Sequence, residues 1–93
     1  MVSRSVTIRT ETGVHARPAA MFVKLANRFP CDIYVEREGV KINGKSIMGL
    51  MMLALTRGST IIITAEGEKE DEAVNALVEL VEKNFEKEDI LTS

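Results

Sequence analysis

The segment Gly13-Val14-His15-Ala16-Arg17-Pro18-Ala19-Ala20 separates an alternating stretch of sequence from a stretch with helical spacing. A proline fits the first turn of a helix, because its missing N–H would have no intrahelical partner there. Pro18 therefore predicts that a helix begins near Ala16, with His15 just before it. The first turn leaves backbone N–H groups unpaired at the positive end of the helix dipole, and this combination favours bound anions.

His15 is the only histidine of the chain, and its position suits a phosphoryl acceptor. A helix N-terminus disfavours imidazolium and so favours the neutral ring, which is the nucleophilic form. Arg17 adds a planar cation that matches phosphate oxygens. A phosphate on the ring would then lie where the backbone amides and Arg17 point. The alternative is a capping or packing histidine in an ordinary loop.

The hydrophobic pattern outside this segment predicts further strands and helices. Val2 to Arg9 alternates and is typical of a strand. A helix is expected from Ala16 to Phe29, where Pro30 ends it. Its buried stripe is predicted to be Ala19, Phe22, Val23, Ala26 and Phe29. The later elements are expected at Asp32 to Glu36 and Val40 to Ile42 (a hairpin through Glu38-Gly39), Ile47 to Ala54 (a helix), Thr60 to Ala65 (a strand) and Glu70 to Phe85 (a helix).

This order, β-α-β-β-α-β-α, predicts an α+β fold, an open-faced sandwich with a four-stranded antiparallel sheet and three helices on one face. The length of 93 residues predicts one domain over residues 1–93. The sequence has no 18-residue apolar run and no basic leader followed by an apolar run. We therefore expect a cytoplasmic protein without membrane insertion.

Composition narrows the classes of partner and site. Cys31 is the only cysteine, so we expect it to pack in the core, with no intramolecular disulfide. One histidine and no acidic grouping at ligand spacing predict no metal site, and no cofactor is expected. Residues 1–65 hold nine Lys/Arg against four Asp/Glu, whereas residues 66–93 hold three against ten. The basic part favours acidic protein surfaces, and the few aromatics argue against nucleic acid.

Ser46 stands just before the second predicted helix, where a serine hydroxyl can cap the helix N-terminus. Capping alone would explain the residue. A phosphorylation site is the other interpretation, and the two are compatible because a helix N-terminus tolerates a phosphate.

The run from Ile47 to Leu55 is too apolar for an ordinary amphipathic segment. Leu50 and Leu53 suit the core, yet one short helix cannot bury every side. Methionine side chains adapt to several partners. We expect some of four residues at the surface, the alternative being that all of them lie in the core: Ile47, Met48, Met51 and Met52.

Three segments together resemble a known family. Thr12 to Ala20 is similar to the active-site segment of HPr, the histidine-containing phosphocarrier of the bacterial sugar phosphotransferase system. Lys45 to Leu50 resembles the regulatory-serine segment of that family in Gram-positive-type bacteria. Gly58 to Gly67 resembles its last strand and the turn that follows. The spacing matches over essentially the whole chain, and HPr has the same open-faced fold.

The resemblance implies a phosphoryl carrier and not an enzyme. Enzyme I would phosphorylate His15 on Nδ1, and His15 would pass the group to the A component of a sugar-specific Enzyme II. Arg17 would orient the phosphate, and the amides of Ala16 and Arg17 would cap it. The residues expected to dock partners are Ala20, Met21, Lys24, Ile47, Met48, Met51 and Met52.

The resemblance also implies regulation at Ser46 by a dedicated kinase/phosphorylase. The added charge would weaken docking to Enzyme I and could recruit a transcriptional regulator. So small a carrier is expected to be a monomer.

Three other functions stay open. The first is a nitrogen-related paralogue with the same His15 chemistry, against which the Ser46 segment argues. The second is a small-molecule-binding regulatory module that uses His15 as a ligand contact. The third, a hydrolytic or acid–base enzyme, has the weakest support. Glu11 is near His15 in the sequence, but no Ser, Cys or second carboxylate stands beside it as an evident partner. A purely regulatory paralogue without phosphotransfer is disfavoured by the presence of His15.

Overall fold

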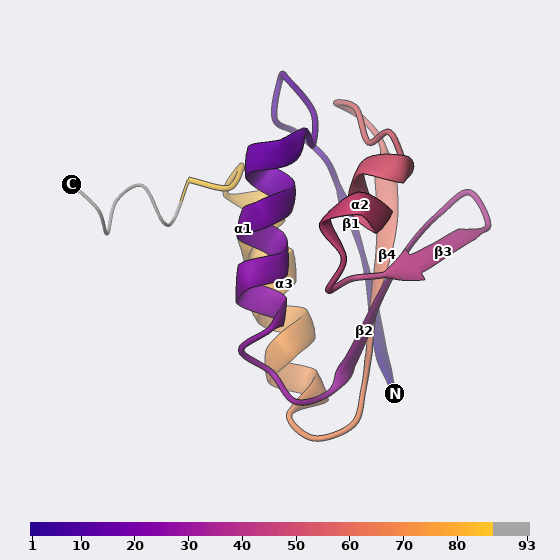
Figure 1. The fold of residues 1–93 in the computed structure, drawn as a ribbon, viewed down its shortest axis with the longest axis vertical. Coiled ribbons are helices and arrows are strands. Elements are labelled where there is room, and N and C mark those ends of the chain that lie inside the picture. The colour runs from indigo at the N-terminus through magenta and orange to yellow at the C-terminus, as the bar shows by residue number, and fades with distance from the viewer. Residues whose placement is uncertain (87–93) are drawn as a thin grey trace.

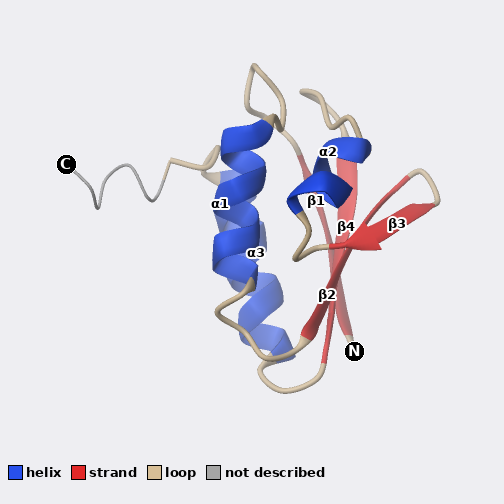
Figure 2. Ribbon diagram, viewed as in Figure 1, coloured by secondary structure: helices blue, strands red, loops and turns tan. Residues whose placement is uncertain are grey.

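A computed structural model describes residues 1–86, in which three helices cover one face of a four-stranded antiparallel sheet (Figures 1 and 2). The predicted fold class and element order are confirmed. The predicted domain, residues 1–93, extends beyond the described residues. The strands are β1 (Val2–Thr7), β2 (Asp32–Arg37), β3 (Val40–Asn43) and β4 (Thr60–Glu66), and the helices are α1 (Ala16–Ala26), α2 (Ile47–Met52) and α3 (Glu70–Glu82).

The sheet has the strand order β1-β4-β2-β3, so the first strand pairs with the last. In the middle of the sheet Val6 pairs with Ile61, and Ile63 lies opposite Val35. These four side chains are buried under the helices, as the alternation of a half-buried strand requires. The other face is mostly polar, apart from the exposed Ile62, and two hydroxyl pairs join β1 to β4 there: Ser3 with Thr64 at 2.8 Å and Thr7 with Thr60 at 3.3 Å.

The core lies between the sheet and the buried stripes of the helices. Ala19, Phe22, Val23 and Ala26 of α1 are buried, as predicted. Cys31 is buried as well, at 2% exposure. Helix α3 packs on β1 and β4, and α1 packs on both α2 and α3.

Helix α1 ends at Ala26, three residues before the predicted end at Phe29. The last turn tightens, because the N–H of Arg28 donates to Leu25 O (3.0 Å) and that of Phe29 to Ala26 O (3.1 Å). A residue that precedes a proline is disfavoured in the helical region, so Phe29 cannot continue the helix into Pro30. Phe29 is therefore half-buried beyond the helix and only packs against the edge of the core.

Helix α3 ends at Glu82 and not at Phe85 as predicted. Asn84 and Phe85 both have left-handed backbone angles, with φ of 57° and 61°. The N–H of Asn84 donates to Val81 O (3.0 Å), and the N–H of Phe85 donates to Leu80 O (2.9 Å). This pair of bonds forms a Schellman C-cap with asparagine in the left-handed position. Phe85 is buried all the same, because the cap turns it back toward the core.

Helix α2 spans Ile47–Met52, shorter than the predicted range that reached Ala54. Ala54 has a left-handed φ of 51°, which ends the helix. From β2, the Nη1 of Arg37 donates to Leu53 O (2.9 Å) and Ala54 O (3.0 Å). Arg37 thus satisfies two carbonyl groups that follow the short helix and joins it to the sheet.

No helix within residues 1–86 has the length and apolar character needed to cross a membrane. The same residues contain no group of three His, Cys, Asp or Glu side chains arranged to hold a metal ion.

Candidate functional site

His15 is the N-cap of α1, and its ring is exposed. Its backbone is extended, with φ of −97° and ψ of −163°. The carbonyl of His15 accepts the first helical hydrogen bond, from the N–H of Ala19 at 3.0 Å, whereas the His15 side chain makes no capping bond. The backbone therefore serves the helix while the imidazole is left to other partners.

The loop that carries His15 is fixed to the segment after α2. The N–H of Val14 donates to Leu55 O at 2.9 Å, and the N–H of Gly13 donates to Thr10 O at 3.0 Å. Gly13 has φ of 73°, and a Cβ added there would lie 2.6 Å from Leu55 O. Only glycine combines this backbone angle with this close approach. The position of His15 therefore depends on a contact between two loops distant in the sequence.

The N-termini of the three helices within residues 1–86 differ in their capping side chains and in the charges of their first turns. In α2 the Ser46 side chain accepts a hydrogen bond, and in α3 the first turn carries three acidic residues. Helix α1 has neither a side-chain cap nor an acidic residue in its first turn. The amides of Ala16 and Arg17 lie in that turn, where helical geometry supplies no acceptor, and Pro18 has no N–H. Among the described residues, the α1 N-terminus thus differs from the other two in having neither a capping side chain nor a first-turn carboxylate.

Ser46 caps α2 as predicted, since its Oγ accepts a hydrogen bond from the N–H of Gly49 at 3.0 Å. The neighbouring Lys45 extends to the end of α1, where its Nζ donates to Phe29 O at 2.8 Å. This bond joins the Ser46 segment to α1. Helices α1 and α2 run in opposite directions (Figure 1), so their N-caps His15 and Ser46 lie at opposite ends of the helix pair.

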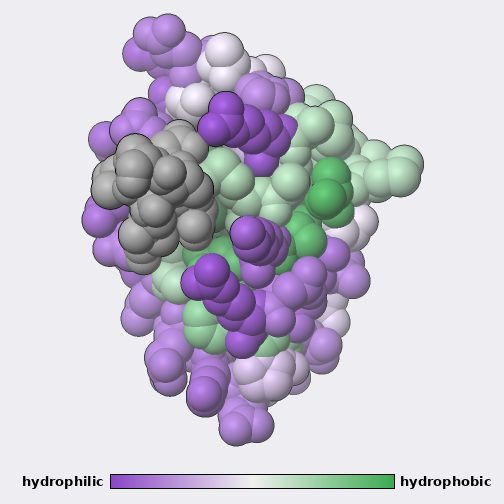
Figure 3. All heavy atoms as spheres, turned by 60° about the vertical axis from the view of Figure 1, so that its left-hand side comes forward, coloured by the Kyte–Doolittle hydropathy of each residue, from purple (hydrophilic) through white to green (hydrophobic). Residues whose placement is uncertain are grey.

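We call the four exposed side chains of α2, Ile47, Met48, Met51 and Met52, the α2 patch. Met48 and Met52 are 75% and 77% exposed, whereas Leu50 and Leu53 are buried. The expectation that part of this apolar run reaches the surface is confirmed. Figure 3 shows apolar atoms gathered on this side of the molecule, bordered by strongly hydrophilic ones.

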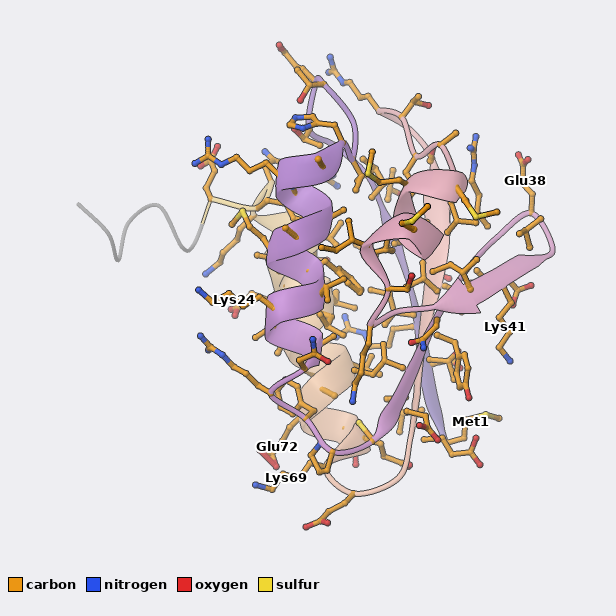
Figure 4. The ribbon with its side chains drawn as sticks, in the orientation of Figure 1. Met1, Lys24, Glu38, Lys41, Lys69 and Glu72 are labelled. Atoms are coloured by element: carbon orange, nitrogen blue, oxygen red, sulfur yellow. The ribbon has the colours of Figure 1, made fainter. Side chains whose placement is uncertain are left out.

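The predicted docking residues of α1 differ in exposure. Ala20 and Lys24 are exposed, and Met21 is half-buried against the core. Figure 4 shows Lys24 on the side of α1 that faces away from α2. Lys24 therefore lies across α1 from the α2 patch, and its docking role stays a prediction.

Two contributors to the site were not predicted from the sequence: Leu55, whose carbonyl holds the His15 loop, and Arg37, which holds the end of α2. Both act across long sequence separations, and no local pattern indicates such contacts.

The profile of the family PTS-HPr, described as the PTS HPr component phosphorylation site, matches residues 2–83. This chain belongs to the HPr family. One relative within it is the HPr-like protein Crh of Halalkalibacterium halodurans, which is 52% identical over 83 residues that cover 89% of this chain and 99% of that protein. Another is the phosphocarrier protein HPr of Pseudomonas aeruginosa, 47% identical over 88 residues that cover 94% and 98% of the two chains. As an HPr-family protein, the chain is a phosphoryl carrier and not an enzyme.

Solved structures of HPr-family proteins have the same fold as this chain. HPr-C-His from Thermoanaerobacter tengcongensis matches with a TM-score of 0.88 and 46% identity, covering 91% of this chain and 96% of that one. Crh of Bacillus subtilis, described as a swapped dimer, and an HPr dimer from T. tengcongensis each match with a TM-score of 0.73. The expectation of a monomer is not supported by these two neighbours and stays a prediction.

Proposed function

We propose that this chain carries a phosphoryl group on His15 between phospho-Enzyme I and the A component of a sugar-specific Enzyme II. One observation supports the proposal above all. The exposed His15 stands at the only helix N-terminus within residues 1–86 that has neither a side-chain cap nor a first-turn carboxylate. This residue lies inside the region that matches the family's phosphorylation-site profile.

The transfer follows from the chemistry of these groups. The Nδ1 lone pair of neutral His15 forms a bond to phosphorus as the bond between phosphorus and Enzyme I breaks, and the electron pair of that bond leaves on Enzyme I. The new dianion lies at the positive end of the α1 dipole. The amides of Ala16 and Arg17 cap its oxygens, and the Arg17 guanidinium neutralises part of its charge. The onward transfer to Enzyme II reverses these steps.

The docking surface proposed for both partners combines α1 and the α2 patch. Ala20, Met21 and the patch supply apolar contact, and methionines repack against differently shaped partners. Arg17 and Lys24 add positive charge on α1, which favours partners with acidic surfaces and speeds their association.

A phosphate on Ser46 is proposed to regulate this docking. It would add a charge of roughly −1.5 to −2 at the start of α2, next to the α2 patch. A partner that presents carboxylates there, which we take to be Enzyme I, would then bind less tightly. We assign the modification to an HPr kinase/phosphorylase and its readout to a transcriptional regulator. We propose that all these events occur in the cytoplasm and that the carrier acts as a monomer.

The test is to mix the chain with Enzyme I, magnesium and labelled phosphoenolpyruvate. We expect acid-labile label on the wild type and none on His15→Ala, whose folded signal by circular dichroism should match the wild type. The Enzyme I preparation is first shown to charge another HPr. Absence of label on the wild type would contradict the proposal and favour a ligand-binding module instead. Transfer to nitrogen-regulatory acceptors but not to sugar-specific ones would favour the nitrogen-related paralogue.

A second candidate is a regulator of the Crh type, acting through Ser46 alone. The identities of 52% and 48% to two Crh proteins favour it. It predicts acid-stable label from an HPr kinase on Ser46 and no acid-labile label from Enzyme I. The exposed His15 side chain, which makes no capping hydrogen bond, favours the carrier.

A further inference from the structure

A polar surface pocket of about 460 Å³, open to solvent and called the cavity below, lies at the end of the sheet where β2 and β4 separate. Its volume is within the range of small-molecule sites. None of its lining residues belongs to the His15 loop or the α2 patch. The cavity is lined by Arg37, Glu38, Thr56, Arg57, Gly58, Ser59 and Thr60.

The cavity has its origin in the strand topology. Pairing between β2 and β4 ends at Glu36 opposite Ile62. Beyond that pair β2 turns into its hairpin with β3, and Glu38 lies at the tip of that hairpin (Figure 4). The chain enters β4 through a turn at Gly58, which has φ of 94° and donates its N–H to Ile8 O at 2.7 Å. This bond holds the lining segment 56–60 against the end of β1, away from β2.

Two guanidinium groups give the cavity its chemistry. Nη1 of Arg37 is fixed by the carbonyl groups of Leu53 and Ala54 at 2.9 and 3.0 Å, so this cation is held in place at the wall. Arg57 is exposed, and no hydrogen bond or ion pair within residues 1–86 involves its side chain. A fixed and an available guanidinium on one cavity match the oxygens of a phosphate group.

The remaining groups suit a ligand with hydroxyls. Thr56, Ser59 and Thr60 line the cavity, and their hydroxyls are joined to neighbours. Thr60 Oγ1 lies 3.3 Å from Thr7 Oγ1, and Thr56 Oγ1 lies 3.4 Å from Ser59 Oγ, which also accepts from the N–H of Thr56 at 3.0 Å. A hydroxyl both donates and accepts, so each threonine keeps capacity for a ligand hydroxyl. Glu38 adds the only carboxylate of the wall. A carboxylate accepts hydrogen bonds from hydroxyl groups and repels a second phosphate.

We propose that this cavity binds a polyhydroxylated phosphate monoester, of the sugar monophosphate class. The phosphate lies between Arg37 and Arg57, and the hydroxyl-bearing part faces Glu38 and the threonines. Binding here is independent of phosphoryl transfer at His15, because it needs neither Enzyme I nor a modified chain.

The proposal is tested by following the amide resonances of ¹⁵N-labelled, unphosphorylated full chain during titration with glucose 6-phosphate. Inorganic phosphate and glucose are titrated separately as probes of the two halves of the ligand. We expect saturable shifts at residues 56–60 with glucose 6-phosphate, weaker ones with phosphate, and none with glucose. Shifts confined to residues 13–17 would show that the anion binds at the α1 N-terminus instead and would overturn the proposal.

Arg57→Gln is the informative variant, because Arg37 also anchors α2 and its loss would disturb the fold. We expect at least a tenfold weaker affinity for glucose 6-phosphate. Arg9→Gln is the matched control, since Arg9 is an exposed arginine outside the cavity wall, and it should bind like the wild type. If both variants lost the same amount of affinity for glucose 6-phosphate, the effect would come from the net charge of the protein, which would contradict a defined site. Unchanged affinity in Arg57→Gln would also contradict it.

Discussion

At the start of α2 the Ser46 hydroxyl accepts a hydrogen bond from the N–H of Gly49, whereas at the start of α1 the His15 ring caps nothing. Both N-cap residues have extended backbones, with φ of −119° for Ser46 and −97° for His15. Ser46 therefore caps its helix with its side chain, whereas His15 contributes only its backbone carbonyl to the start of α1. A phosphate on His15 would fill an open position, whereas a phosphate on Ser46 would alter an existing cap. The following variants test this difference.

Gly13→Ala should have the largest effect, because it displaces the His15 loop itself. The new Cβ would meet Leu55 O at 2.6 Å in a left-handed backbone, and we expect a loss of about 2–4 kcal/mol in the free energy of unfolding. Urea denaturation measures it. The control is Gly39→Ala, which has φ of 85° but no atom within 4 Å of the added Cβ. It should lose only about 1 kcal/mol, and an equal loss in both variants would show that the Leu55 contact is unimportant.

Ala16→Asp makes the α1 N-terminus resemble that of α3 by placing a carboxylate in its first turn. An anion near the helix N-terminus is stabilising by about 0.3–1 kcal/mol, so the folded state should not suffer. Repulsion of the incoming phosphoryl group should slow transfer from Enzyme I about tenfold or more, which corresponds to about 1.4 kcal/mol. Ala16→Asn is the neutral control. Transfer at the wild-type rate in Ala16→Asp would argue against phosphate binding at these amides.

Ser46→Ala should remove the α2 cap and lower the free energy of unfolding by about 1 kcal/mol. Ser46→Asp keeps a capping side chain and should stay within about 0.5 kcal/mol of the wild type. Thermal unfolding of the two variants measures both changes. In the proposed mechanism Ser46→Asp also weakens docking to Enzyme I, seen as a raised KM for the carrier. A raised KM of the same size in Ser46→Ala would point to loss of the cap and not to charge.

The smallest effect is expected at α3, whose first turn already holds carboxylates. The N–H of Gly67 donates to Glu70 Oε1 at 2.9 Å, and the Met1 ammonium bonds Oε2 at 3.0 Å. Both bonds lower the pKa of Glu70, so its contribution to stability exists above its ordinary pKa and disappears as the pH falls. The bond to Glu70 raises the pKa of the Met1 ammonium above 8.0, so that contribution disappears as the pH rises.

Glu70→Gln should therefore flatten the dependence of stability on pH at both extremes. Urea midpoints at about pH 3, 6 and 9 measure the change. Glu72→Gln is the control, because Glu72 lies in the same turn and makes neither bond. The same flattening in Glu72→Gln would assign the effect to the net charge of the turn.

The features that could be predicted from the sequence are those that depend on residues close together in the chain. Pro18 indicated the start of α1, Ser46 the start of α2, and the spacing of Phe22, Val23 and Ala26 the buried stripe. The helix ends were predicted less well. Asn84 is compatible with continued helix by spacing, yet it adopts a left-handed C-cap once Phe85 can pack into the core.

The parts of the site that escaped prediction all depend on distant contacts. Gly13 opens the segment that carries His15, but nothing in the neighbouring sequence indicates the Leu55 carbonyl against it. Arg37 follows the predicted strand Asp32 to Glu36, and Lys45 belongs to the segment that resembles a regulatory motif. In the structure Arg37 donates to the carbonyl groups that directly follow α2, and Lys45 donates to Phe29 O beyond the end of α1. Such contacts arise only when the packed sheet brings these segments together.

Helix α2 has six residues, too few to persist alone in water. Its order comes from the Ser46 cap, the Arg37 bonds to Leu53 and Ala54, and the burial of Leu50 and Leu53. None of these anchors belongs to the α2 patch. The outward side chains of α2 can therefore be exchanged, in evolution or in the laboratory, with little cost to folding. A carrier built this way can change its partners while its scaffold stays the same.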